Sequence, residues 1–230
     1  VERPDASFSA SYHGGNKGTW DAINQDSTPD GTRDAWNRML AILNEGMESN
    51  EVYQRIQGNH PDGNRNMEFE DLLDMDNLIN YMILNFYIGN NDWPGRNFWV
   101  GRNRDNGNGF QFYPWDSETS LGLGSGVNND RTGQNTSVAE PFGKTRNNGL
   151  FKSKFADRVH ELFFNHGALY VNPDEPDWDA ANPQNNRPAA GFTALANLIE
   201  KAVVAESARW GDQGGGTPFT RDEHWRPALN

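Results

Sequence analysis

Three side chains that carry oxygen ligands, Asp92, Asn97 and Asp116, have types and positions that suit a shared site. Asp92 lies in a polar turn after an apolar stretch, Asn97 begins a predicted strand, and Asp116 ends the next predicted strand. Because a hairpin brings its two ends together, Asn97 and Asp116 should be neighbours, with Asp92 over the same edge. Carboxylate and amide oxygens favour hard divalent cations. The sequence therefore predicts a site for Mg²⁺, with Mn²⁺ or Ca²⁺ as alternatives.

Structural roles explain the same residues. The asparagines and the aspartate at positions 90–92 can cap the end of the preceding helix, and Asp116 can open a turn. Structural carboxylates outnumber catalytic ones, so the residues taken alone favour this structural explanation.

The spacing also matches the catalytic segment of protein kinases. In that segment an Asp accepts the proton of the substrate hydroxyl, an Asn five residues further along holds a metal ion, and a second Asp follows a short hairpin. Asp92, Asn97 and Asp116 have the same order. The residues before Asp92 are asparagines in place of His-Arg, and those after Asp116 are Ser and Glu in place of Phe-Gly.

The elements that must position these residues are a long helix and a hairpin. Residues 68–88 are predicted to be helical, and the apolar character on all sides of residues 78–88 indicates a helix buried on several faces. Residues 97–102 and 110–115 are rich in aromatic and branched side chains and are predicted to be strands. The Asn- and Gly-rich segment 103–109 between them is typical of a hairpin turn.

Helices are predicted for most of the rest of the chain. Apolar residues recur at helical spacing within 32–43, 151–163 and 195–206. Residues 117–148 and 171–190 are predicted to be loops, because the first is rich in Gly and Asn and the second holds four prolines. A loop as long as 117–148 inside a compact domain tends to be functional or mobile.

Composition limits the possible functions. The 230 residues suit one large domain, and the absence of cysteine excludes disulfides, thiolate metal sites and cysteine nucleophiles. The formal charge of −12 argues against nucleic acid as a partner, since a phosphate-backbone binder needs a basic face. No apolar run approaches the roughly 20 residues of a membrane span. The aromatic content of 12% indicates a folded protein.

Five stretches resemble the CotH (spore-coat protein H) kinase family and occur in the same order along roughly residues 30–225. They are Leu78–Pro94, Asn97–Trp99, Phe112–Asp116, Phe155–His160 with the Phe-Phe-Asn at 163–165, and Glu206–Asp212. One such motif would be weak, but five in series identify the chain as similar to this family.

The resemblance implies a fold and an activity. It implies a mainly α domain with a small β-hairpin, like the α+β C-terminal lobe of a protein kinase, and transfer of the ATP γ-phosphoryl group to serine of a protein substrate. Asp92 would be the catalytic Asp, Asn97 a metal ligand and Asp116 the metal-holding Asp after the hairpin, and Glu118 would be a further metal group. Family members phosphorylate spore-coat proteins and have relatives in secreted bacterial proteins, so a secreted, spore or cell-surface location is expected.

The family's nucleotide-binding lobe is expected to be largely missing. Residues 1–30 are weakly patterned and are predicted to be loop or short edge structure, a remnant before a catalytic and metal-binding domain at 31–230. Lys17 lies in a Gly-rich segment, whereas a phosphate-binding Lys belongs on a strand. A neighbouring domain or partner could supply this lobe, and without it the chain could be inactive. The alternative is a non-catalytic surface-binding or adhesion module of a larger secreted protein.

Overall fold

The computed structural model describes residues 3–229, and the chain divides into two compact units, residues 1–158 and 159–230. Each unit is described by itself. The described elements of the first unit are α1 (Ala6–His13), η1 (Lys17–Thr19), β1 (Trp20–Asn24), β2 (Ser27–Asp30), α2 (Asp34–Leu43), α3 (Asn50–Arg55), α4 (Met75–Tyr87), β3 (Phe98–Asn103), β4 (Gln111–Pro114), η2 (Ser137–Ala139), α5 (Glu140–Thr145) and most of α6 (Gly149–Phe163).

The predicted hairpin is confirmed, but it is half of a larger sheet. Strands β3 and β4 are antiparallel, with Phe98 opposite Pro114 and Gly101 opposite Gln111. On its other side β3 pairs with β1, so that the sheet has the order β2-β1-β3-β4 and all its described pairs are antiparallel. The domain is therefore α+β as expected, and the expected single small hairpin is corrected to a four-stranded sheet.

The two additional strands come from the segment that was predicted to be loop or short edge structure. Asp5 caps α1 by accepting the N–H groups of Ser7 (2.8 Å) and Phe8 (3.1 Å), and β1 then passes through the middle of the sheet. The prediction for residues 1–30 is wrong here. A central strand that is buried on both faces does not alternate between apolar and polar residues, and β1 is buried at four of its five positions.

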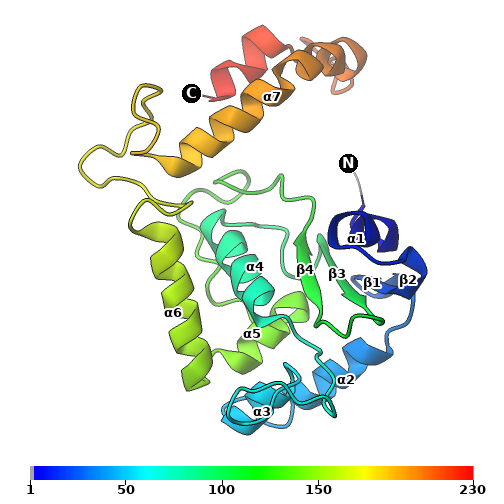
Figure 1. The fold of residues 1–230 in the computed structure, drawn as a ribbon. Helices are drawn as coiled ribbons and strands as arrows, with labels where there is room; N and C mark the ends of the chain where they lie inside the picture. The colour runs from blue at the N-terminus through cyan, green and yellow to red at the C-terminus, as the bar shows by residue number, and fades with distance from the viewer. Residues whose placement is uncertain (1–2, 230) are drawn as a thin grey trace. The chain divides into compact units, whose positions relative to one another are not determined.

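Helices cover both faces of the sheet. On one face Phe8 of α1 packs edge-on against Tyr113, with ring centroids 5.6 Å apart. On the other face Phe112 contacts Tyr81 of α4 at 5.5 Å and Trp36 of α2 at 6.3 Å. Figure 1 shows α1 and α4 on opposite sides of the strands. Neighbouring residues of one strand thus point to opposite faces, and the hairpin is fixed from both sides.

Helix α4 begins later than predicted. It runs from Met75 to Tyr87, and residues 68–74 precede it without helical structure. The side chain of Asp74 accepts the N–H of Asn77 at 2.9 Å and so caps the first turn. The predicted apolar stretch 78–88 forms most of the helix, and Leu78, Ile79 and Met82 are among its fully buried side chains.

The remaining predictions hold for helices and fail for part of two loops, since residues 187–190 of the predicted loop 171–190 are already helical. Helices α2, α6 and α7 (Arg187–Trp210) lie where apolar periodicity places them. The segment 117–148, predicted to be all loop, contains η2 and α5 at residues 137–145. Phe142 of α5 contacts Phe86 of α4 at 5.5 Å and Phe151 of α6 at 5.9 Å, so tertiary aromatic packing supports a helix that the Gly- and Asn-rich composition hides.

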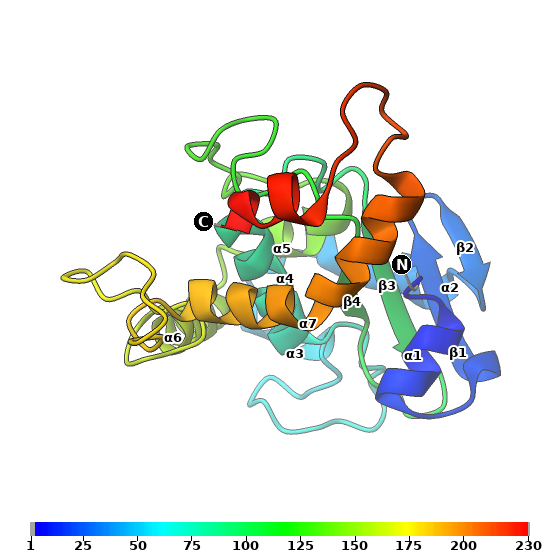
Figure 2. The ribbon, with the colours of Figure 1, turned by 90° about the horizontal axis from the view of Figure 1, so that it is seen from above.

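The second unit consists of the end of α6, the long helix α7 and two short helical turns, η3 (Arg221–Trp225) and η4 (Pro227–Leu229). After α7 the chain reverses, so that η3 and η4 lie beside the second half of α7 (Figures 1 and 2). Asn186 caps the start of α7 by accepting the N–H of Ala189 at 3.1 Å.

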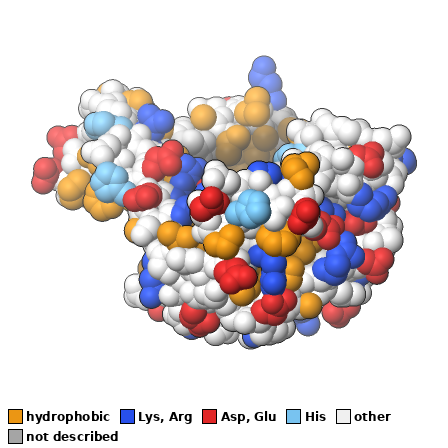
Figure 3. Space-filling model, turned by 60° about the horizontal axis from the view of Figure 1, so that its bottom comes forward, with side chains coloured by type: hydrophobic (Ala, Val, Ile, Leu, Met, Phe, Trp, Pro, Cys, Tyr) orange, Lys and Arg blue, Asp and Glu red, His pale blue; other side chains and the backbone are white. Residues whose placement is uncertain are grey.

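Charges on the surface are mixed. Ion pairs join Arg38 to Glu70 and Arg55 to Glu45 around α2 and α3. Acidic and basic side chains are interspersed over the face in Figure 3, as is typical of a solvated surface. Between residues 3 and 229, none of the helices combines the length and the apolar character that crossing a lipid bilayer requires.

Asp71, in the segment before α4, is expected to make stability depend on pH. Burial raises the pKa of its carboxyl from 3.8 to about 6, and one of its oxygens is buried without a hydrogen-bond partner. The folded state therefore holds the proton more tightly than the unfolded chain does. The stabilisation is complete below about pH 4 and is lost as the pH rises to about 6. Water screens the partly exposed carboxyl, so the free energy of unfolding should fall by on the order of 1 kcal/mol.

Urea unfolding of the wild type and of Asp71→Asn between pH 4 and pH 7.5 measures this effect. The stability of the wild type relative to the variant should fall across this range and level off above about pH 6. Asp62→Asn is the control, because Asp62 is exposed and hydrogen bonds from Asn64 lower its pKa below 3.8. Its profile above pH 4 should run parallel to that of the wild type. If the stability of Asp71→Asn also ran parallel to that of the wild type, the pH dependence would not come from Asp71.

Candidate functional site

The two ends of the β3–β4 hairpin meet as the sequence predicts. Asn97 directly precedes β3, Asp116 follows β4 after one intervening residue, and the strands are in register between them. The side-chain Nδ2 of Asn97 donates a hydrogen bond to the backbone carbonyl of Asp116 at 3.1 Å. These two residues therefore lie at one edge of the sheet.

Both residues have a backbone conformation that is rare outside glycine. Asn97 has φ 55° and Asp116 has φ 51°, which places them in the left-handed region. Asn and Asp tolerate this region better than other residues with a Cβ atom. Residues held in such conformations cluster at functional sites, where the surrounding structure maintains them. Their shared conformation at one edge of the sheet motivates a functional hypothesis for this edge.

Asp92 is exposed on a loop that is anchored by its neighbour. Trp93 is only 1% exposed, and its indole Nε1 donates a hydrogen bond to the hydroxyl of Tyr81 at 2.8 Å. Burial raises the pKa of Tyr81, so the hydroxyl that accepts this bond stays protonated and neutral. The ring of Trp93 also packs against Phe86 with centroids 6.0 Å apart. The core thus fixes the backbone beside Asp92 and leaves its carboxylate in solvent.

Hydrogen bonds join the loop after α4 to the loop after β4. The N–H of Asn91 donates to the carbonyl of Thr119 at 2.8 Å, and the N–H of Leu121 donates to the carbonyl of Ile88 at 2.7 Å. With the bond between residues 97 and 116, these contacts hold residues 88–97 along residues 116–121. Two segments, joined to each other by hydrogen bonds at both ends, therefore carry Asp92, Asp116 and Glu118.

Buried asparagines add to this junction. The sequence predicts only a capping role for Asn90, and the role of Asn85 was missed. Asn90 is 1% exposed, and its Nδ2 donates to Asn85 Oδ1 at 2.9 Å and to Ser117 Oγ at 3.3 Å. Asn85 in turn donates to the carbonyl of Tyr81 at 2.9 Å. The position of Asn85 within an otherwise apolar helical stretch is the signal that could have identified this role.

Arg131 has a positioning role that its sequence context did not reveal. Its type and place in the sequence admit two interpretations, steering of phosphate or substrate acids and a plain surface salt bridge. Its Nη2 instead donates to the backbone carbonyls of Trp93 and Asn91, the latter at 3.4 Å. The guanidinium therefore supports the loop that carries Asp92 from a segment almost forty residues further along the chain.

The donors at this edge suit a hard cation that retains part of its own coordination shell. Asp92, Asp116 and Glu118 have exposed side chains. The Oδ1 of Asn90 and the Oγ1 of Thr119 are buried without a hydrogen-bond partner. Within residues 3–229 no cluster of three or more His, Cys, Asp or Glu side chains forms a ready metal cage. Mg²⁺ is usually held by one or two carboxylates, with water and phosphate oxygens completing the shell, so this donor set fits it.

A cavity of about 350 Å³ adjoins Asp116 through the preceding residue. Trp115 and Trp99 line it, with ring centroids 6.3 Å apart at 70°, and Arg3 and Gln25 are among its polar residues. The Nε1 of Trp99 is buried and has no hydrogen-bond partner. Trp115 is only partly buried. The cavity thus offers aromatic surface, a cation and a free N–H donor next to the acidic edge.

Comparison with known proteins gives one match. A family model described as CotH kinase protein matches residues 3–164, which is more than half of the chain. The match begins within the segment predicted to be a remnant and ends before the stretch Glu206–Asp212, so it differs at both ends from the resemblance seen in the sequence. No curated protein and no solved structure matches the chain.

Proposed function

Because the chain belongs to the CotH kinase family, we propose that it transfers the γ-phosphoryl group of ATP to a serine hydroxyl of a protein substrate. The observation that carries the proposal is the junction of two loops that presents Asp92, Asn97 and Asp116 in the order of a kinase catalytic segment. CotH is a spore-coat family, so we further propose a substrate at the spore or cell surface, or among secreted proteins.

Asp92 is assigned to the substrate hydroxyl. Its exposed carboxylate accepts the serine proton as the serine oxygen forms a bond to the γ-phosphorus, while the bond from that phosphorus to the β,γ-bridging oxygen breaks and ADP leaves with the electron pair. Trp93 and Arg131 hold the backbone beside Asp92 from two directions. Such positioning supplies much of the rate in a reaction that needs little covalent chemistry from the protein.

Asn97, Asp116 and Glu118 are assigned to a divalent cation, for which Mg²⁺ is the first candidate and Mn²⁺ or Ca²⁺ the alternatives. Such an ion, when bound, neutralises charge on the phosphates. The left-handed backbone of Asn97 and Asp116 keeps the two residues at one edge. Glu118 lies on the same segment as Asp116 and directly precedes Thr119, whose backbone carbonyl accepts the N–H of Asn91. An exposed carboxylate at this edge can bind a cation without first breaking hydrogen bonds or ion pairs inside the protein.

The cavity lined by Trp99 and Trp115 is the proposed location for part of the nucleotide. Aromatic rings stack on bases, a guanidinium such as that of Arg3 suits phosphate, and the free Nε1 of Trp99 can donate to an acceptor on the ligand. The cavity also adjoins the residue before Asp116, which places it next to the proposed metal ligands.

The test combines binding and transfer. Calorimetry should detect ATP binding in the presence of Mg²⁺ or Mn²⁺ and much weaker binding without a metal. Mass spectrometry of serine-rich proteins incubated with the chain, Mg²⁺ and ATP should find phosphoserine, and Asp92→Asn should remove it. Absence of both metal-dependent ATP binding and phosphoserine would contradict the proposal and favour a non-catalytic binding module.

A further inference from the structure

The second unit contains a cavity of about 410 Å³ that the kinase assignment does not use. It lies between the second half of α7 and the turns η3 and η4, where the chain reverses. All its lining residues fall at or beyond Val203, outside the match to the CotH family at residues 3–164. Its volume is in the range of sites for small ligands.

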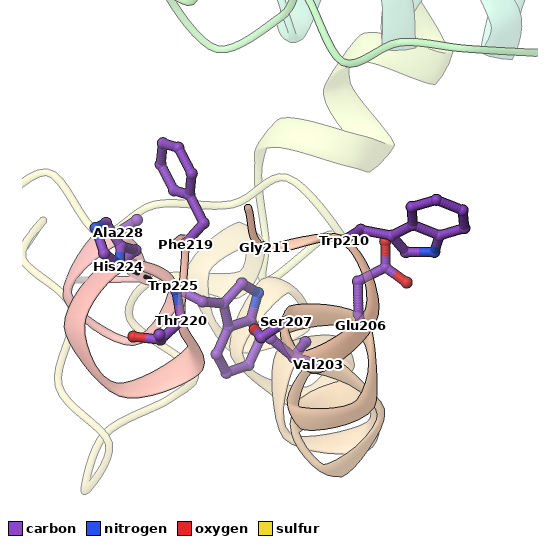
Figure 4. A pocket seen from close by; sticks show the side chains of 10 residues that line it. All are labelled: Val203, Glu206, Ser207, Trp210, Gly211, Phe219, Thr220, His224, Trp225 and Ala228. Carbon is purple, nitrogen blue, oxygen red and sulfur yellow. Dashed lines mark hydrogen bonds between the residues drawn. The ribbon is translucent and has the colours of Figure 1, made fainter. Parts of the chain in front are cut away.

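Aromatic rings dominate the walls of this cavity. Trp210 at the end of α7, Phe219 in the following loop and Trp225 in η3 come from three successive segments and border the same hollow (Figure 4). The Arg209 guanidinium carbon lies 4.9 Å from the centroid of the Trp210 ring, so one of these rings already contacts a cation. Aromatic faces carry negative electrostatic potential and attract cations.

The cavity has one acidic lining residue, and one cation lies beside it, because the Arg209 guanidinium contacts the ring of Trp210. Glu206 is that acidic residue, and its carboxylate forms no ion pair within residues 3–229. Arg221 in η3 and Arg226 directly after it form ion pairs with other acids. Arg221 pairs with Asp222 at 2.9 Å, and Arg226 pairs with Glu200 and Asp222. Figure 4 shows the Glu206 carboxylate beside the ring of Trp210.

Several hydrogen-bond acceptors that line the cavity are already engaged, among them the Thr220 hydroxyl and the backbone carbonyls of Ser207 and Gly211. The Nδ1 of His224 accepts the N–H of Thr220 at 3.0 Å, so in the neutral ring the other nitrogen carries the proton and acts as a donor. A primary ammonium has three N–H donors that need acceptors and is strongly hydrated. A fully alkylated ammonium has none, and aromatic walls with one carboxylate suit it better.

From these features we infer that the cavity between α7 and η3 binds an alkylated ammonium group, which packs against Trp210, Phe219 and Trp225 and is neutralised by Glu206. The group could belong to a free quaternary ammonium compound or to a trimethylated lysine of a protein, which share this chemistry. The inference does not depend on the phosphoryl-transfer proposal, because the two sites lie in different units.

Binding of choline to the full chain, measured by calorimetry and by the indole N–H signals in NMR spectra, tests the inference. Choline should bind about tenfold more tightly than its neutral isostere 3,3-dimethylbutan-1-ol. Glu206→Gln, a change at an exposed residue, should weaken choline binding about tenfold and leave the isostere unaffected. Trp210→Leu should weaken choline binding to a similar extent.

Two matched variants serve as controls. Glu223→Gln alters an exposed acid of η3 that does not line the cavity, and Trp178→Leu alters a tryptophan of the same unit outside it. Both should bind choline as the wild type does. Tighter binding of a peptide with trimethyllysine than of choline would show that the ammonium group belongs to a protein side chain. Weaker binding of the peptide than of choline would show that the group belongs to a free compound. Equal binding of choline and its isostere, or no effect of Glu206→Gln, would overturn the inference.

Discussion

Asp116→Asn is expected to lower metal-dependent phosphorylation by about 10³-fold, the effect of removing several kcal/mol of charge stabilisation at the phosphates. The substitution keeps the size of the side chain and replaces one carboxylate oxygen with an amide nitrogen. Asparagine also tolerates the φ of 51° at this position, whereas alanine would add backbone strain to the loss of charge. Asn97 can still donate to the backbone carbonyl of residue 116. The variant therefore tests the carboxylate and leaves the loop intact.

Asp105→Asn is the matched control, because Asp105 is an exposed acid in the turn of the same hairpin. It should retain activity. Calorimetry should show metal-dependent ATP binding at least tenfold weaker for Asp116→Asn than for Asp105→Asn, while thermal unfolding of the two variants stays close to that of the wild type. Full phosphorylation by Asp116→Asn would exclude Asp116 as a metal ligand. If the wild type itself transfers no phosphate, the difference in metal-dependent binding still decides this role.

Phe112→Ala is expected to destabilise the first unit by about 3–5 kcal/mol. The ring is 1% exposed and lies between Tyr81 of α4 and Trp36 of α2. Its removal leaves a cavity that the packed helices can fill only in part. A loss of this size is a large share of the stability of an ordinary domain, and it should loosen the hairpin end that carries Asp116.

Urea unfolding monitored by tryptophan fluorescence measures this loss as a lower midpoint. Phe192→Ala is the control, because Phe192 is 50% exposed on α7 and surface substitutions usually change stability by less than about 0.5 kcal/mol. A loss below about 1 kcal/mol for Phe112→Ala would show that the sheet does not depend on its packing against α4 and α2.

The elements that depend on residues close together in the sequence were predicted correctly. The apolar run that forms α4 and the Asn- and Gly-rich turn between β3 and β4 are continuous in sequence, and the structure confirms both elements. The adjacency of Asn97 and Asp116 followed from the hairpin alone. The catalytic and metal-binding roles of Asp92, Asn97, Asp116 and Glu118 stay predictions.

Contacts between distant segments account for what was missed. Strand β1 pairs with β3 some eighty residues later, and its burial on both faces removes the alternation that marks a half-exposed strand. Thr119 accepts the N–H of Asn91 through its backbone carbonyl, and the Arg131 side chain donates to the backbone carbonyl of Trp93. A backbone partner leaves no mark in the sequence, because every residue type carries one. The start of α4 was misplaced because the capping role of Asp74 competes with continuation of the helix.

The central place of β1 has a consequence for shortened versions of this chain. A chain that begins at residue 31 would lack β1 and β2, and β3 would become the edge of a two-stranded ribbon. All six residues of β3 are buried, so its unpaired N–H and C=O groups would flank apolar side chains in water. Exposed edges of this kind recruit strands from other molecules, and an isolated two-stranded ribbon is marginally stable. Self-association should accompany removal of these thirty residues.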